Sequence, residues 1–150
     1  MKIIMIKRIR VVLGMLVLLA VLPACAAPPI EVTFAQLVST PQKYTGRTVT
    51  TEAFCFSGFE TIVLAERLEP SGLAAGHLNP KGQMVWIEGG IPKPVFDQLY
   101  EQHMMGPSER YGKVRVTGKF EYGSKYGHLD GFNAQITPAE MTLVAWSPPA

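Results

Sequence analysis

The sequence predicts a mainly β domain with two short helices, behind an N-terminal export leader. Residues 113–122 (K-V-R-V-T-G-K-F-E-Y) alternate apolar with polar side chains, and residues 48–56 (T-V-T-T-E-A-F-C-F) are rich in β-branched and aromatic types. Both patterns are typical of strands. A basic start followed by a short apolar stretch indicates the leader. The 150 residues suffice for one domain and such a leader.

The leader occupies residues 1–24 and has the parts of a signal peptide. Met1–Arg10 is basic, and the apolar run Val11–Leu22 has 12 residues. A run of this length is short for a membrane-spanning helix and typical of an export signal. We therefore expect these residues to be removed from the mature protein.

The residues that follow indicate a lipid anchor. Leu22–Cys25 reads L-P-A-C and resembles the lipobox of bacterial lipoprotein precursors. The resemblance implies cleavage after Ala24, lipid on the Cys25 thiol and acylation of the new amino terminus, for example with palmitate. Two or three chains anchor a protein stably in a membrane, and residues 25–32 would be the lipidated cysteine and its tether. A secretory signal cleaved near Ala24–Ala27 and an uncleaved anchor are the alternatives.

The first half of the domain is expected to hold one helix and two strands. Thr33 is a suitable N-cap for a short helix. In the strand predicted over 48–56, Phe54 falls on the opposite face from Cys55, and apolar residues on both faces predict a bulge that shifts the alternation. Ser-Gly then turns the chain into a second strand over 61–65.

The middle of the domain is expected to hold a loop, a strand and a helix. Residues 67–83 contain several Gly and Pro with little periodicity, which predicts a loop. Residues 84–88 form a short apolar strand. Pro92 then opens a helix whose apolar side runs to Tyr100.

Two more strands complete the domain. The alternation over 113–122 is interrupted by Gly118, which is consistent with a tight bend. A Gly-rich loop over 123–131 leads to a last strand over 135–145. Pro138 restricts that strand to an edge or a bulge.

The order of these elements predicts the architecture. A single helix between the third and fourth of five short strands is the layout of the OB-fold, a small, partly open barrel. Another small α+β roll is an alternative, as is an SH3-like barrel, although the latter does not normally hold a helix at this place. We predict an OB-fold-like five-stranded barrel over 33–146, followed by a tail at 147–150.

Four segments in this order resemble a group of bacterial exported OB-like proteins that has no established activity. The segments are Y-T-G-R-T-V-T (Tyr44–Thr50), V-W-I-E (Val85–Glu88), V-R-V-T-G-K-F (Val114–Phe120) and Y-G-H-L (Tyr126–Leu129). The likeness covers about residues 33–145, and the chain departs from it at Ala53, where a Gly is often seen. The resemblance implies the fold and an exported location.

The positive charge of the chain belongs to its leader. Four of the 14 Lys and Arg residues precede residue 25, whereas all 12 Asp and Glu residues follow it. The mature chain therefore carries 10 basic and 12 acidic side chains, by subtraction of those four. Without a positive excess it lacks the main source of nonspecific affinity for nucleic acid, so we expect no nucleic-acid partner.

The two cysteines are not expected to serve catalysis. If Cys25 takes lipid, Cys55 is unpaired and is best explained as a small buried apolar residue in a strand. A disulfide between the two is the competing interpretation.

No motif predicts catalysis, a metal or a cofactor. His77, His103 and His128 lie in separate segments without the ligand spacing of a zinc site. Glu88 ends an apolar strand and has no visible partner that would make it a general acid or base.

The loop between the last two strands is the best candidate for binding. OB-folds use this loop to bind oligonucleotides or oligosaccharides, and aromatic side chains beside a His and charged groups could stack on a sugar or peptide. The candidate residues are Tyr122, Lys125, Tyr126, His128, Asp130 and Phe132. The competing interpretation is that the aromatic residues are buried and that His128 caps a turn with Asp130.

Together these features predict a membrane-anchored lipoprotein that faces the extracytoplasmic side of the bacterial cell envelope. Its OB-like domain would be a noncatalytic binding or accessory module for an envelope protein or glycan. The alternative is a small, hydrolase-like envelope enzyme that uses the loop around His128.

Overall fold

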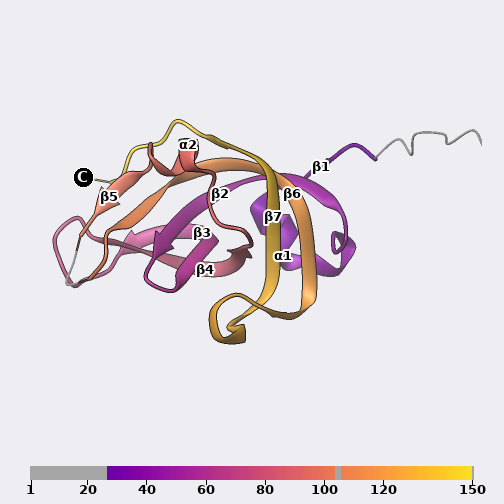
Figure 1. The fold of residues 1–150 in the computed structure, drawn as a ribbon, viewed down its shortest axis with the longest axis horizontal. Helices are drawn as coiled ribbons and strands as arrows, with labels where there is room; N and C mark the ends of the chain where they lie inside the picture. The colour runs from indigo at the N-terminus through magenta and orange to yellow at the C-terminus, as the bar shows by residue number, and fades with distance from the viewer. Residues whose placement is uncertain (1–26, 104–105, 150) are drawn as a thin grey trace, which may run out of the picture.

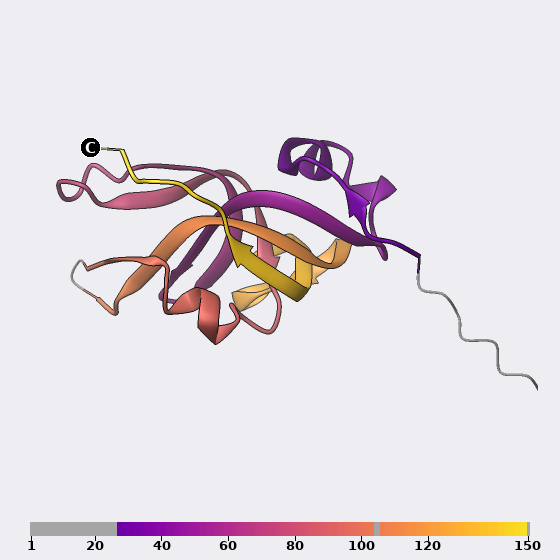
Figure 2. The same cartoon turned by 90° about the horizontal axis from the view of Figure 1, so that it is seen from above.

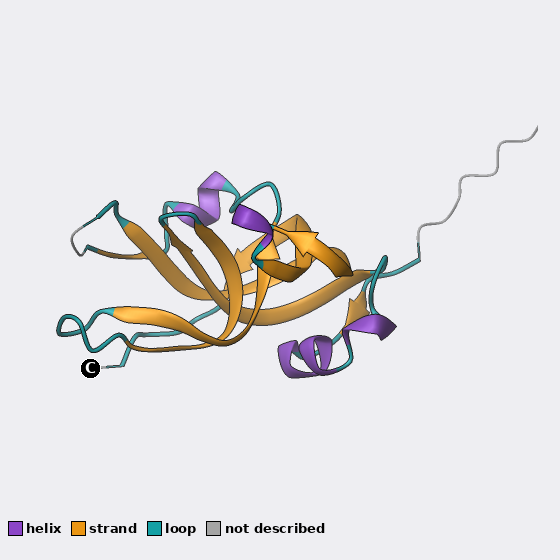
Figure 3. Ribbon diagram, turned by 90° about the horizontal axis from the view of Figure 1, so that it is seen from below, coloured by secondary structure: helices purple, strands orange, loops and turns teal. Residues whose placement is uncertain are grey.

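Seven strands and two short α-helices form the described part of the chain, and strands make up most of it (Figure 3). The computed structural model describes residues 27–103 and 106–149. The predicted signal peptide and the lipidation of Cys25 therefore lie outside the described residues. In the described residues, no helix has the length and apolar character to span a membrane.

Figure 1 labels the strands and helices on the ribbon. They are β1 (Ile30–Glu31), β2 (Thr48–Gly58), β3 (Thr61–Pro70), β4 (Leu78–Ile87), β5 (Tyr100–Gln102), β6 (Glu109–Tyr126) and β7 (Phe132–Leu143), with helices α1 (Phe34–Ser39) and α2 (Lys93–Phe96). As predicted, Thr33 caps α1, and it does so in a capping box with Gln36. Ile30–Glu31, which we expected to belong to the tether, pairs with β2.

Five of the described strands close into a hydrogen-bonded ring in the order β2-β3-β4-β7-β6, because β6 pairs with β2 as well as with β7. The ring is uneven. The β6–β7 and β2–β6 ladders are long and antiparallel, whereas the parallel β4–β7 contact consists of two residue pairs, Trp86–Gln135 and Ile87–Ile136. Seen from above, α1 and α2 lie on opposite sides of the strands (Figure 2).

The alternation in β6 is confirmed. Val114, Val116 and Phe120 are fully buried in the main hydrophobic cluster, while Arg115 and Lys119 are exposed and Thr117 is half-buried. At Gly118 a side chain would collide with the carbonyl oxygen of Thr137, so the two strands approach closely there. The pairing register shifts beside Gly118, which places a bulge next to Pro138, one of the two options that this proline allows.

The predicted loop over 67–83 is wrong. β3 continues to Pro70, β4 begins at Leu78, and the two pair along this extension with a bulge after Ala65. The extension forms an arm that reaches beyond the ring (Figure 1), and most of the β3 residues in it are exposed or half-buried. Because neither face of the arm is fully buried, its sequence shows no apolar alternation, and only residues 71–77 form a turn.

The predicted helix from Pro92 through Tyr100 is shorter in the structure. α2 spans Lys93–Phe96, and Tyr100 begins β5 instead. β5 pairs with β6, whose first residues precede the segment that alternates in sequence. This long-range pairing overrides the local helical pattern.

The predicted bulge within 48–56 is also wrong. β2 pairs with β6 in one continuous register from Thr48 to Ser57. Both faces of β2 carry apolar residues because each face meets its own hydrophobic cluster. Cys55 lies in the main cluster, whereas Phe56 packs in a second cluster and Phe54 contacts Trp146 at a ring-centroid distance of 5.2 Å.

Candidate functional site

The six predicted binding residues lie around the β6–β7 hairpin, but the loop is shorter than expected. Tyr122, Lys125 and Tyr126 belong to β6. The strands still pair at Tyr126 and Phe132, and a 3-10 turn (His128–Asp130) lies between them. The Gly-rich residues before Tyr126 therefore extend the strand instead of forming a loop.

The structure brings three of the six residues to one surface. Lys125, Asp130 and Phe132 line a shared open cavity of about 410 Å³. Tyr122 packs against the main core and lines a different cavity. Tyr126 is half-buried in the hairpin. None of the three aromatic residues is fully buried, although Tyr122 packs against the core, and Phe132 both packs on Trp86 and lines the cavity.

His128 joins the tip of this hairpin to the β2–β3 turn. Its Nε2 lies 3.2 Å from Oε2 of Glu60, so the ring reaches the β2–β3 turn, whereas the competing interpretation had it cap a turn with Asp130. Glu60, Leu129 and Asp130 all have positive φ angles, between 52° and 59°, which is uncommon for residues other than glycine. The two turns lie on the same side of the domain (Figure 1).

Both turns present apolar side chains to solvent. Phe59 is 68% exposed and Leu129 is 86% exposed. Backbone strain of this kind persists only where the surrounding structure imposes it, and it concentrates at functional sites. Each of the two linked turns thus carries an exposed apolar side chain next to a residue with a positive φ angle.

A groove runs between these turns, mainly along β4. The cavity lined by Lys125 continues into a second one of about 380 Å³, and the two share Met84 and Phe132. We call this continuous surface the groove. Besides the shared residues, Phe56, Phe59, Lys81 and Glu109 line its second half.

Beneath the groove lies the second hydrophobic cluster, which includes Phe56 and Tyr111. Burial raises the pKa of Tyr111 above its usual value, with a smaller contribution from the neighbouring Tyr100. The floor of the groove is therefore apolar and aromatic, while its rim carries charged groups.

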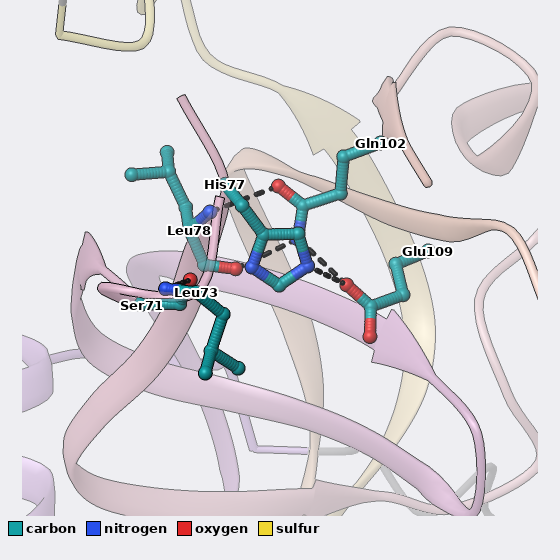
Figure 4. Close-up of polar contacts among 6 residues, drawn as sticks. All are labelled: Ser71, Leu73, His77, Leu78, Gln102 and Glu109. Atoms are coloured by element: carbon teal, nitrogen blue, oxygen red, sulfur yellow. Dashed lines mark hydrogen bonds and ion pairs between the residues drawn. The ribbon is translucent and has the colours of Figure 1, made fainter. Parts of the chain in front are cut away.

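A buried polar cluster adjoins the far end of the groove (Figure 4). It joins His77 in the β3–β4 turn, Gln102 on β5 and Glu109 at the start of β6. Oε2 of Glu109 lies 2.9 Å from Nε2 of His77 and 2.7 Å from Nε2 of Gln102. Gln102 also accepts from the N–H of Leu78 at 3.0 Å and donates to its carbonyl at 2.7 Å. The cluster thus ties the β3–β4 arm to β5 and β6.

The hydrogen-bond partners indicate which ring nitrogen of His77 carries the proton. The two amide protons of Gln102 go to Glu109 and to the Leu78 carbonyl, and a carboxylate only accepts, so His77 donates from Nε2. The other ring nitrogen, Nδ1, is buried and has no partner among the described residues. Glu109 is therefore held through one oxygen, and its Oε1 has no hydrogen bond within the described chain.

Sequence reasoning missed His77, Gln102 and Glu109 as a unit. His77 and Glu109 are 32 residues apart and become neighbours only through the β3–β4 arm and β5. The sequence predicted the arm as a loop and the start of β5 as part of a helix. The spacing of His77 and Glu109 does not indicate that they are in contact.

The chemistry available in the groove favours binding. It offers aromatic surface, exposed lysines and one fixed carboxylate. Among the described residues, no group of three or more His, Cys, Asp or Glu side chains could hold a metal ion. Cys55 is fully buried in the main core, a free thiol among the described residues, and burial raises its pKa to about 12.

Comparison with known proteins adds no assignment. No protein-family model, curated protein or solved structure matches this chain. Any function must therefore be inferred from the residues and their geometry.

Proposed function

We propose that this protein is an exported lipoprotein of the bacterial cell envelope, anchored through Cys25, whose OB-like domain is a noncatalytic binding module. The lipobox-like L-P-A-C segment supports the anchor. The five-stranded ring, with α2 between its third and fourth strands in chain order, supports an OB-like architecture.

The groove is the observation that supports the binding function most directly. β3 and β4 are the second and third strands of the ring in chain order. The groove lies mainly along β4, with Thr61 at the start of β3, and is flanked by the β2–β3 turn and the β6–β7 turn. OB-folds bind their ligands on the second and third strands and with these two turns.

An envelope protein or glycan suits this surface best. Apolar rings pack on the faces of sugars or on peptide side chains, and a charged rim fixes orientation. The small acidic excess of the mature chain disfavours nucleic acid.

The binding role is tested by removing the exposed apolar side chains of the two turns. The tagged full chain is crosslinked in an envelope extract and recovered, and the captured component is identified. We expect Phe59→Ser combined with Leu129→Ser to lose that component, because Phe59 lines the groove and Leu129 is exposed on the turn that flanks it. Leu73→Ser is the matched control, since Leu73 is also 68% exposed but lies in the β3–β4 turn and in neither of these two turns. Equal capture by the double variant would contradict the proposal.

The anchor is tested separately with Cys25→Ser. We expect this variant to be neither acylated nor processed after Ala24, as measured by labelling with a fatty-acid analogue and by the mass of the chain. Cys55→Ala should label like the unaltered chain. Unchanged labelling of Cys25→Ser would exclude that cysteine as the lipid site.

A further inference from the structure

Glu109 lines the groove and has one carboxylate oxygen without a hydrogen bond in the described residues. Its Oε2 is occupied by His77 and Gln102, whereas Oε1 has no hydrogen-bond partner in the described residues. The side chain of Glu109 is 22% exposed, and it lines the groove. Two donors thus fix the orientation of a carboxylate whose second oxygen remains available to a ligand.

Gly58 keeps that oxygen uncovered. A side chain at Gly58 would place its Cβ 3.5 Å from Oε1 of Glu109 and 2.8 Å from the ring of Phe56. The second distance is too short for any real contact, so only glycine fits without a shift. Because glycine has no side chain, nothing at position 58 covers the carboxylate oxygen.

The charge of Glu109 is not balanced by a lysine or arginine. Within the described residues, its one ion-pair contact is with His77, whose Nδ1 has no acceptor. Lys81 lines the same part of the groove, but it is exposed and forms no ion pair with Glu109. Water and salt screen the charge of an exposed lysine more strongly than that of a partly buried carboxylate.

We propose that Glu109, left uncovered by Gly58, forms a subsite on the groove for an ammonium group carried on an apolar or aromatic framework. An ammonium donates charge-assisted hydrogen bonds to a carboxylate, and these are about twice as strong as neutral ones. The framework of the ligand packs on the aromatic floor beside Phe59 and Phe132. This inference rests on the proposed use of the groove and names the chemistry that the groove selects.

Two matched probes test the inference on the full chain in detergent micelles. 2-Phenylethylammonium carries the charge, and 2-phenylethanol has the same shape without it. We expect NMR titration to show at least tenfold tighter binding of the ammonium compound, with shifts at Gly58 and Glu109. Added salt should weaken its binding and leave that of the alcohol unchanged.

Substitutions identify the carboxylate responsible. Glu109→Gln keeps an oxygen that can accept from His77 and should reduce the preference for ammonium to less than twofold. Glu140→Gln removes the same charge at an exposed position on β7 and should leave the preference intact. Lys81→Gln should raise the affinity for ammonium, since it removes a like charge.

The outcomes separate this inference from the function on which it rests. Equal binding of the two probes, or a preference that survives in Glu109→Gln, would overturn the ammonium subsite and leave the groove as a binding surface. Binding of neither probe would also overturn the subsite. The crosslinking experiment on Phe59 and Leu129 decides the wider function independently. If Glu109→Gln does not fold, the unaltered chain still tests the subsite. Binding of 2-phenylethylammonium that added salt does not weaken would overturn it.

Discussion

Replacing Gln102 with alanine is expected to destabilise the domain by about 3 kcal/mol. Gln102 is buried, and its side chain satisfies both backbone groups of Leu78, with hydrogen bonds of 3.0 and 2.7 Å. Leu78 is itself buried, so the substitution leaves an N–H and a carbonyl without partners, at about 1–3 kcal/mol each. Loss of the bond to Glu109 adds to this. Denaturant unfolding of the full chain, followed by tryptophan fluorescence, measures the change.

Gln98→Ala is the matched control for this prediction. Gln98 also bonds a backbone carbonyl, that of Pro94 at 2.7 Å, but in an exposed setting where water replaces the bond. We expect a change of about 0.5 kcal/mol or less. If Gln102→Ala and Gln98→Ala destabilised the chain equally, the buried cluster would not be joining the β3–β4 arm to β5 and β6.

Three further predictions concern other parts of the fold. Gly118→Ala should lower the unfolding free energy by about 2 kcal/mol, because its Cβ meets the Thr137 carbonyl; unchanged stability would mean that the strands separate easily there. Trp146→Ala should cost about 2 kcal/mol, since the Trp146 ring contacts the rings of Phe54, Tyr100 and Tyr111; a thermal melt no lower than that of the unaltered chain would refute this. Cys55 should resist a thiol reagent at neutral pH, and rapid labelling without unfolding would contradict its burial. Burial raises its pKa from 9.0 to about 12, so the stability it contributes is present below pH 9 and is lost as the pH rises toward 12, a loss absent in Cys55→Ala.

The strands that alternate or are strongly apolar were predictable from the sequence. From Lys113 to Glu121 in β6, buried residues alternate with exposed or half-buried polar ones, so the sequence pattern reflects the two faces of the strand directly. The capping box at Thr33 was accessible for the same reason, because it depends on residues three apart.

The β3–β4 arm and β5 could not be predicted because other parts of the chain stabilise them. The arm has no fully buried face, and β5 exists because β6 extends to Glu109 and offers an edge. Likewise, the second cluster covers Phe56 only once Tyr111 and Leu78 arrive from distant segments. A local sequence pattern cannot indicate contacts between such distant segments.

The candidate site was likewise predictable only where its residues lie close together in the sequence. Lys125, Asp130 and Phe132 were found because they share one hairpin, and the structure places all three on the groove. The carboxylate of Glu109 and its partners were missed because three separate segments bring them together. Sequence reasoning thus located one side of the groove and could not locate the other.

Site-specific photo-crosslinking tests the central claim, that the groove and its two turns are the binding surface, most directly. A photoreactive phenylalanine analogue is placed at Phe59, Leu129 or Leu73 of the full chain in living cells, and the crosslinked species are compared by mass. We predict the same product from Phe59 and Leu129, which flank the groove, and its absence from Leu73. No product at either groove position, or the same product at all three, would contradict the account.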